Sequence, residues 1–361
     1  MILKKRFCPY CFKQLKTIQY LCNNKSCIDS YNPKGHIILN KKADKNEFCS
    51  CDKCSSITNI KVCPYCNSVL PNSIKNLKTI CIVGNFSSGK SYFCASLLDI
   101  LHEGKCFKDP KISVAFANKE SLNIYNKEYK HYIQNNRFLS ATIECTPCIL
   151  ELSYGNNKRI KKTTLSFWDM SGEIHSEDDF MKIRNCIVNS DLIVFLIDPL
   201  SNGKIRSMMD LKNYKNITPL TTITYAEILN NVIQIIKNNT RNNKKIRIPL
   251  CIAFSKWDLV IETPGLLPNG MICGQNDLQI SSGYDKQRID SISNEIRSLL
   301  RQQWKESNLV DLAEQNFETV KYFSFSAWGS SNSGKAGAPI LNPYRVEYPL
   351  LWYLHEKKII I

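Results

Sequence analysis

The chain has 361 residues, 43% of them hydrophobic, and is long enough to bury a sizeable core in one large domain or two modest ones. Its formal net charge of +16 leaves room for a surface that binds nucleic acid or an acidic partner. Apolar runs such as Leu192–Ile197 are far too short to cross a bilayer, and Met1–Arg6 does not resemble a secretory signal, so we expect a cytoplasmic location without a membrane span.

The first segment of the chain is rich in cysteine. Of the 17 cysteines, nine fall within residues 8–66, and in a cytoplasmic chain such clustering favours metal ligation over disulfides. Eight of the nine form pairs with metal-ligand spacing, at Cys8 and Cys11, Cys22 and Cys27, Cys51 and Cys54, and Cys63 and Cys66. Four thiolate pairs suit two tetrahedral zinc ions, which stabilise a segment with few apolar residues. We therefore expect a zinc-ribbon region over residues 1–70 and a linker over 71–78.

The pairing of these cysteines has more than one solution. Taking the pairs in sequence order assigns the first two to one Zn²⁺ and the last two to the other. A cross-braced arrangement is the alternative, and Cys49 is an alternative ligand to Cys51. His36 is not expected to bind metal, because the thiolates suffice. An iron–sulfur cluster fits these spacings less well than zinc, and a redox pair lacks its usual context. The cysteines beyond this region are expected to be small buried hydrophobes.

Residues 1–78 carry 14 basic and 4 acidic side chains, a net charge of +10, which zinc-bound thiolates would lower to about +6. Aromatic residues lie among these lysines, at Phe7, Tyr10, Phe12, Tyr20 and Tyr65. They suit base stacking beside phosphate contacts, and they equally suit the small core of a zinc ribbon. We expect the region to dock a protein partner, with nucleic-acid binding as the alternative.

From Thr79 onward, apolar strands alternate with amphipathic helices. The predicted strands are Ile80–Val83, Ile149–Leu152, Thr164–Trp168, Leu192–Ile197, Leu250–Phe254 and Tyr322–Phe325. The predicted helices are Ser91–His102, Lys119–Gln134, Tyr225–Lys237, Lys286–Trp304 and Tyr344–His355. This alternation predicts an α/β domain over residues 79–361, with a mostly parallel sheet covered by helices on both faces. Residues 200–220 and 259–284 resist assignment, and the second segment is a candidate lid or partner-binding loop.

The first strand runs into a sequence that fits the phosphate-binding loop G-x-x-x-x-G-K-[ST] at every fixed position. Its glycines let backbone N–H groups approach a phosphate, and the next helix points its N-terminus at the same anion. Lys90 supplies charge to the β- and γ-phosphates, and the Ser91 hydroxyl is a ligand for Mg²⁺. The residues expected at the phosphates are Gly84, Ser87, Ser88, Gly89, Lys90, Ser91 and Tyr92. The sequence therefore predicts a nucleotide-binding protein.

Two further motifs follow predicted strands. In Asp169-Met-Ser-Gly172, the aspartate can hold Mg²⁺ through water and the glycine N–H can meet the γ-phosphate. In Ser-Lys256-Trp-Asp258, the carboxylate can accept two hydrogen bonds from guanine but would face an acceptor on adenine. The stem of Lys256 can lie against the base. At the end of the last predicted strand, Ser326-Ala327 offers a backbone N–H to guanine O6.

These four motifs, each at a strand end, resemble those of the Ras-like superfamily of GTPases over residues 79–356. The resemblance implies a switch threonine between the phosphate loop and Asp169, for which Thr142 is preferred to Thr146. It also implies GTP hydrolysis with Mg²⁺. Two residues depart from the family pattern: Ser255 stands where asparagine is usual, and Glu173 replaces the glutamine that orients the attacking water, so hydrolysis is expected to be slow.

More narrowly, the chain resembles the bacterial double-GTPase type of the TRAFAC clade. It shares an Asp-x-x-Gly-Glu switch and a C-terminal Pro-Leu-Leu-Trp helix, here Pro349–Trp352. The resemblance implies a place in a prokaryotic conflict or defence system. The first hypothesis is thus a GTP/GDP switch localised by its zinc region. The alternatives are a nucleic-acid-binding module with a regulatory or inactive nucleotide domain, and an ATPase, against which Asp258 argues.

Overall fold

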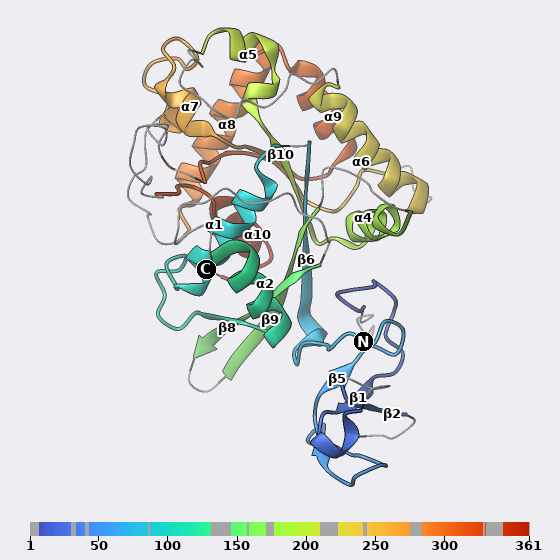
Figure 1. The fold of residues 1–361 in the computed structure, drawn as a ribbon. Helices are drawn as coiled ribbons and strands as arrows, with labels where there is room; N and C mark the ends of the chain where they lie inside the picture. Colours follow the sequence, from blue (N-terminus) through green and yellow to red (C-terminus); the bar gives the residue numbers. More distant parts are fainter. Residues whose placement is uncertain are drawn as a thin grey trace.

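The computed structural model describes residues 7–29, 34–39, 43–85, 87–130, 146–156, 159–170, 177–209, 223–240, 244–274, 284–327, 329 and 342–360. A small cysteine-rich unit at the N-terminus lies against one end of a large α/β domain (Figure 1). Among the described residues, no helix has both the length and the apolar composition needed to span a bilayer.

The cysteine-rich unit is built from very short antiparallel strands. Three of them form a sheet in the order β2-β1-β5, and two more form a hairpin. Their bounds are β1 Gln19–Cys22, β2 His36–Ile38, β3 Cys49–Ser50, β4 Ile57–Thr58 and β5 Lys61–Val62, with a 3₁₀ turn η1 at Lys25–Cys27. Strands of two to four residues bury little apolar area, so such a unit needs a further source of stability.

The α/β domain is organised on a seven-stranded sheet in the order β12-β11-β10-β6-β9-β8-β7. The first five strands in this order pair in parallel, and the β9–β8 and β8–β7 pairs are antiparallel. The bounds are β6 Leu77–Gly84, β7 Ser113–Phe116, β8 Cys148–Asn156, β9 Arg159–Asp169, β10 Leu192–Ile197, β11 Leu250–Phe254 and β12 Val320–Ser324. The predicted mostly parallel sheet is confirmed. Strand β7 escaped prediction because its alternating exposed and half-buried side chains give a weak pattern.

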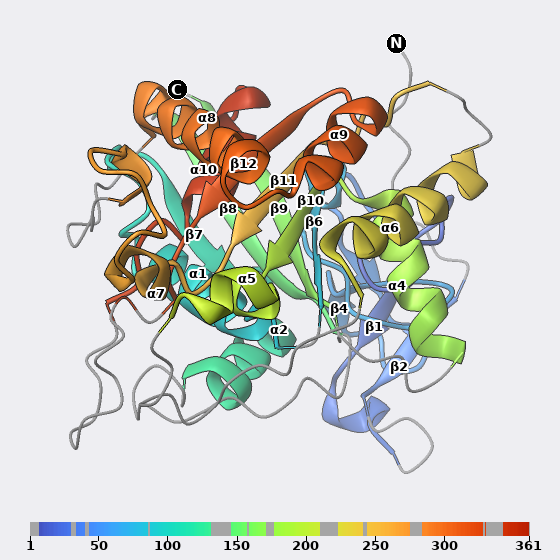
Figure 2. The ribbon, with the colours of Figure 1, turned by 90° about the horizontal axis from the view of Figure 1, so that it is seen from above.

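Helices cover both faces of this sheet, as predicted. In Figure 2, α4 and α6 lie on one side, whereas α1 and α10 lie on the other. The α-helices are α1 Lys90–His102, α2 Lys119–Ile124, α4 Glu177–Asn189, α5 Gly203–Ser207, α6 Tyr225–Thr240, α7 Trp257–Glu262, α8 Lys286–Gln302, α9 Ser307–Asn316 and α10 Tyr348–Glu356. Short 3₁₀ turns occur at η2 Ile74–Asn76, η4 Pro199–Ser201 and η5 Ile272–Gly274. Strand β6 begins at Leu77, inside the predicted linker 71–78.

Two predicted helices differ from those observed. The helix expected over Lys119–Gln134 is α2, followed by a π-helical turn, η3, at Tyr125–Lys130, beyond which the expectation lies outside the described residues. The last helix was expected from Tyr344 but begins at Tyr348. Tyr344 instead exchanges backbone hydrogen bonds with Ser326, and Arg345 has a left-handed φ of 59°, so neither residue continues a helix.

The core is centred on β10, in which all six residues are buried. A strand with neighbours on both edges and helices on both faces has no exposed side, which accounts for its uninterrupted apolar sequence. The seven described cysteines outside the N-terminal unit are also buried and free, as expected of small hydrophobic residues.

We predict that Ile193→Ala lowers the free energy of unfolding by about 2–5 kcal/mol, because the truncation leaves a cavity in the centre of the core. Ile160→Ala on β9 is the matched control, since Ile193 is fully buried whereas Ile160 is 67% exposed. This control should change the free energy by no more than about 0.5 kcal/mol. Urea unfolding of both variants is the measurement, and equal losses would contradict the burial of β10.

Candidate nucleotide-binding site and metal centres

The predicted phosphate loop connects the end of β6 to the start of α1. A side chain at Gly84 would place its Cβ 2.5 Å from the Leu196 carbonyl oxygen and 2.8 Å from Ser88 Oγ, so only glycine fits. Ser87 and Gly89 both adopt a left-handed backbone, with φ of 57° and 86°. The chain thus turns sharply between the strand and the helix, and the first turn of α1 faces the space above the sheet edge.

Polar groups of this loop point inward. Lys90 is 7% exposed, and its ammonium donates to the carbonyls of Gly84 at 3.1 Å and Asn85 at 2.7 Å. The Ser88 hydroxyl is fully buried and has no hydrogen-bond partner among the described residues. A buried hydroxyl without a partner costs free energy, and a phosphate oxygen here would accept from it and from Lys90. These residues therefore fit a bound phosphate group.

Asp169 ends β9, the strand beside β6, and pairs in register with Ile82. It is 5% exposed and lies near Cys94 of α1. Burial, and after it the negative charge of Asp169, raises the pKa of the Cys94 thiol well above its usual range. Ser91 and Tyr92 are half-buried in the first turn of that helix. The arrangement brings a carboxylate near the helix turn that carries Ser91, and these oxygens are of the kind that Mg²⁺ prefers. Thr142, Gly172 and Glu173 lie outside the described residues, and their roles stay predictions.

The two base-recognition motifs meet at the ends of β11 and β12. The Ser326 hydroxyl donates to Asp258 Oδ1 at 2.7 Å, and the Trp257 N–H donates to the Phe325 carbonyl at 3.1 Å. Burial raises the pKa of Asp258, which is 8% exposed, and the hydrogen bond from Ser326 opposes that rise. The next residue, Ala327, accepts a hydrogen bond from Ser96 of α1 at 3.3 Å. The structure thus holds both motifs beside the helix that follows the phosphate loop.

Ser255, which stands where related proteins usually have asparagine, connects the phosphate loop to the base motif. Its hydroxyl donates to the Ile197 carbonyl at 3.2 Å, and its N–H donates to the same oxygen at 2.9 Å. A Cβ at Gly89 would lie 3.6 Å from Ser255 Cβ, so the two loops are in near contact. The short serine side chain therefore bonds to β10 and leaves the loops adjacent.

Asp198 belongs to this site although sequence reasoning missed it. Its carboxylate is 2.6 Å from the ammonium of Lys256 and also caps η4 by accepting from the Leu200 N–H at 2.9 Å. Asp198 is 2% exposed, and Lys256 has a left-handed φ of 50°. The charged contact fixes the position of the lysine head. The signal was available, because Asp198 directly follows a buried strand at the same sheet edge as the predicted motifs.

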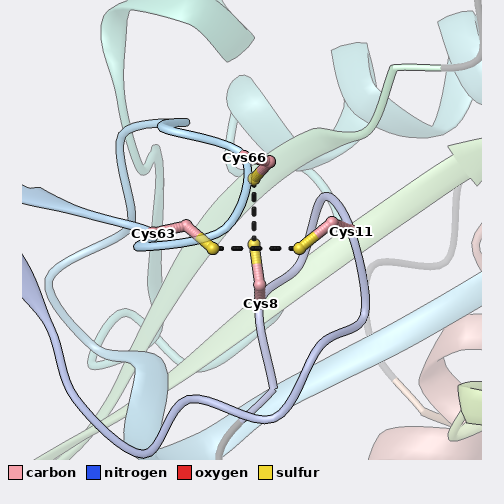
Figure 3. A group of neighbouring side chains, drawn as sticks. All are labelled: Cys8, Cys11, Cys63 and Cys66. Carbon is pink, nitrogen blue, oxygen red and sulfur yellow. Dashed lines mark hydrogen bonds between the residues drawn. The ribbon is translucent and has the colours of Figure 1, made fainter.

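The paired cysteines form two clusters. Cys8, Cys11, Cys63 and Cys66 converge in the outer cluster (Figure 3), and Cys22, Cys27, Cys51 and Cys54 form the inner cluster. Closest sulfur–sulfur distances are 3.7 and 3.8 Å in the outer cluster and 3.6 and 3.7 Å in the inner one. Four sulfurs about 2.3 Å from a central Zn²⁺ would lie about 3.8 Å apart. Both clusters therefore fit zinc.

This pairing is nested: the first cysteine pair meets the fourth and the second meets the third, which is neither the sequential nor the cross-braced arrangement considered above. The reason is the antiparallel contact of β1 with β5, in which Gln19 faces Val62. It brings Cys63 to the start of β1, near the first cysteine pair, and leaves Cys22 at the far end, near the third pair. Cys51 is a member of the inner cluster and Cys49 is not. His36 hydrogen-bonds Asp52 at 2.8 Å and lies beside that cluster.

Within the outer cluster, the protein already favours thiolate formation. A hydrogen bond from the Cys8 thiol is the main cause that lowers the pKa of Cys66 to about 4, and donating it raises the pKa of Cys8. In the inner cluster, hydrogen bonds from Ser56 lower the pKa of Cys54 to about 6. A thiolate is the form of cysteine that binds metal, so these hydrogen bonds favour metal ligation by Cys66 and Cys54.

A family model described as Double-GTPase 2 matches residues 78–337, which confirms the predicted double-GTPase type. No curated protein matches the sequence. The GTP-bound GTPase-like domain of Ski7 from S. cerevisiae is 15% identical with a TM-score of 0.34 over 79% of this chain and 51% of that chain, so the chain spans about half its length. The SRb-GTP/SRX complex from Chaetomium thermophilum is 13% identical, with a TM-score of 0.30 over 72% of this chain and 95% of that chain. TM-scores this low support no conclusion about the chain.

We predict that the double variant Cys11→Ser/Cys66→Ser loses one of two bound zinc ions, because the nested pairing places both residues in the outer cluster. Sequential pairing would place them in different clusters, and both ions would be lost. The matched control is Cys11→Ser/Cys54→Ser, which removes one ligand from each cluster and should cost both ions. Metal content per chain, measured by mass spectrometry after dialysis, decides between the two pairings.

Proposed function

The chain belongs to the Double-GTPase 2 family, and we propose that it is a nucleotide-controlled switch that binds and hydrolyses GTP with Mg²⁺. The observation that carries the proposal is the contact of Asp258 with Ser326 beside the phosphate loop. The phosphate loop, the loop that carries Asp258 and the loop that carries Ser326 are far apart in the sequence but share one edge of the sheet. This is the edge at which α/β proteins bind their ligands.

Guanine selectivity follows from the chemistry of Asp258. Its buried carboxylate accepts hydrogen bonds from N1–H and the exocyclic amine of guanine, while Ser326 holds one of its oxygens in place. Adenine presents a hydrogen-bond acceptor at N1, so it could not donate to this carboxylate. The buried charge would then lack both water and a hydrogen-bond donor, which costs free energy. Lys256, held by Asp198, covers the base plane with its stem, and the Ala327 N–H is the donor assigned to guanine O6. The base pocket therefore rejects ATP through an unpaired buried charge.

The phosphate loop is assigned to hold the β- and γ-phosphates. On binding, the ammonium of Lys90 exchanges its two loop carbonyls for phosphate oxygens, and the Ser88 hydroxyl gains an acceptor. Ser91, Asp169 and Thr142 are the residues assigned to Mg²⁺, which neutralises charge on the phosphates when bound. The Gly172 N–H is assigned to the γ-phosphate and Glu173 to the attacking water. A carboxylate orients water less well beside phosphate charge than an amide does, which accounts for the slow hydrolysis we propose.

The cysteine-rich unit is assigned two zinc ions and the docking of a protein partner, in a prokaryotic conflict system as the resemblance implies. The burial of its aromatic residues favours docking over nucleic-acid binding. Phe12 and Tyr20 are buried, and Phe7 and Tyr10 are half-buried. Among the described aromatics of this unit, this leaves Phe48, at 42% exposure, and Tyr65, at 48%, as candidates for base stacking. The segment 259–284 is a weaker docking candidate, because the backbone N–H groups of Ile272 and Cys273 donate hydrogen bonds to the carboxylate of Glu295 on α8.

Calorimetric titration of the zinc-loaded protein with non-hydrolysable GTP and ATP analogues, in the presence of Mg²⁺, tests the proposal. Tight binding of the GTP analogue with little binding of the ATP analogue is the expected result. Equal affinity for both, or no binding of the GTP analogue, would overturn it.

We predict that Asp258→Asn weakens binding of the GTP analogue by roughly a hundredfold or more, because two hydrogen bonds to a charged acceptor are lost. The amide of asparagine offers one donor and one acceptor, which match O2 and N1–H of xanthine, so affinity for an XTP analogue should rise. Asp109→Asn is the matched control, since Asp109 is exposed and follows the end of α1 that is remote from the phosphate loop. Unchanged GTP affinity in Asp258→Asn would remove this aspartate from the base site.

We also predict that GTP affinity falls as the pH is lowered. Guanine binds the ionised form of Asp258, and burial raises the pKa of this carboxyl group above the ordinary value of about 3.9. As the pH falls through the raised pKa, the acceptor charge disappears and affinity drops about tenfold per pH unit. Titrations between pH 7.5 and 5 measure this, and the residual GTP affinity of Asp258→Asn should stay constant over the same range.

A further inference from the structure

The three Cys-x-x-Cys loops of the N-terminal unit share one backbone geometry. In each, the N–H two residues after the first cysteine points at its sulfur at 3.4 Å, and the residue after the second cysteine donates to the first cysteine's carbonyl at 2.9–3.0 Å. That last residue has a left-handed φ of 57–58° in all three loops, at Phe12, Ser55 and Asn67. Zinc ligation alone therefore requires this turn and nothing particular of the side chain.

Phe12 is the exception among these three residues. Asparagine and small polar residues accept a left-handed backbone readily, whereas a bulky aromatic residue rarely does. Ser55 and Asn67 are exposed, but Phe12 is 8% exposed and belongs to the main core of the α/β domain. Its ring lies 5.1 Å from the ring of Trp168, at an angle of 37°. A strained residue that persists in this way points to a constraint beyond the metal site.

The position of Trp168 gives this contact its meaning. Trp168 directly precedes Asp169, the residue assigned to Mg²⁺, and it is 1% exposed near the end of β9. Phe12 therefore packs on the strand end from which the chain enters the segment of Gly172 and Glu173. Any displacement of the Phe12 ring would open a void beside the last turns of this strand.

A second contact joins the same loop to α2. The Tyr10 hydroxyl accepts a hydrogen bond from Asn118 Nδ2 at 2.8 Å, and Asn118 Oδ1 in turn caps α2 by accepting from the Ser121 N–H at 2.8 Å. From α2 the chain runs through η3 to Lys130 and on toward Thr142. Tyr65 is the equivalent tyrosine in the Cys63–Cys66 loop of the same cluster. It is exposed, and among the described residues its hydroxyl makes no hydrogen bond to α2 or its cap. The outer cysteine cluster thus touches the elements that lead into both predicted switch segments.

We propose that Tyr10 and Phe12 are positioning residues for the nucleotide site, so that zinc at the outer cluster and nucleotide at the phosphate loop bind cooperatively. The proposal rests on the GTP-binding function proposed above. With Zn²⁺ bound, Cys8 and Cys11 hold the loop that presents both aromatic side chains. Nucleotide bound with Mg²⁺ at Asp169 stabilises the end of β9, on which the Phe12 ring packs through Trp168. Such linkage is reciprocal, so each ligand raises the affinity for the other by the same factor.

The test measures zinc release from the full chain into a chromophoric chelator, without nucleotide, with GDP, and with a non-hydrolysable GTP analogue, each with Mg²⁺. Cys11→Ser/Cys66→Ser identifies the phase that belongs to the outer cluster by removing it. We expect the GTP analogue to slow this phase by about fivefold or more, within the usual range of coupling between sites. The inner-cluster phase should not change, because no cysteine of that cluster shares the Phe12 contact.

Two variants locate the coupling. Phe12→Asn installs the residue found at the equivalent position, Asn67. The variant should keep both zinc ions, while nucleotide should no longer slow zinc release from the outer cluster. Tyr10→Phe removes one hydroxyl and should reduce the effect, whereas its matched control Tyr65→Phe should leave it intact. If Phe12→Asn loses zinc, the Tyr10→Phe and Tyr65→Phe pair still decides the question.

The outcomes separate the two proposals. If calorimetry shows GTP binding but zinc release is equal in all nucleotide states, the coupling is wrong and the GTP-binding function stands. If no nucleotide binds, both fall. Release slowed equally in Phe12→Asn and in the unaltered chain would overturn the role assigned to this contact.

Discussion

The close approach of the Gly84 backbone to the Leu196 carbonyl is the constraint on which the site depends. A Cβ at Gly84 would lie only 2.5 Å from that oxygen, so the phosphate loop can leave β6 only where β10 ends beside it. Because β6, β9, β10, β11 and β12 run in parallel, their carboxyl ends share one edge of the sheet. Residues from Gly84 to Ser326 are thereby brought together by backbone pairing before any side chain contributes.

Two of the three buried aspartates at this edge, Asp198 and Asp258, are used in different ways. Asp198 bonds to Lys256 and to the Leu200 N–H, so its charge is compensated within the protein. For Asp258, burial outweighs the hydrogen bond from Ser326, and its pKa is raised. A buried carboxylate that the protein compensates incompletely gains most from an incoming donor. This difference distinguishes the aspartate that organises the pocket from the one assigned to read the base.

Local pattern was sufficient to predict much of the fold. All six predicted strands appear in the sheet. Five of them pair in parallel and four of these end at a predicted loop motif, whereas the sixth, within β8, pairs antiparallel with both neighbours. The nested pairing of the cysteines could not be chosen from the sequence, since spacing within a pair fixes a loop but only the register of β1 on β5 decides which loops meet. Asp198 and Phe12 were missed for a related reason. Each acts through a residue distant in sequence, Lys256 or Trp168, and neither contact has a local signature.

The two cysteine clusters differ in what stabilises them, although their loops share one backbone geometry. The inner cluster is surrounded by residues of its own unit, such as Tyr20 and Ile38. The outer cluster carries Phe12, whose ring is part of the core of the α/β domain. Part of the free energy that holds the outer loop in its strained form is therefore supplied by that domain. The inner cluster is therefore stabilised within its own unit, whereas the loop of the outer cluster gains additional packing against β9. That strand also carries Asp169, so one element links the outer cluster to the candidate nucleotide site.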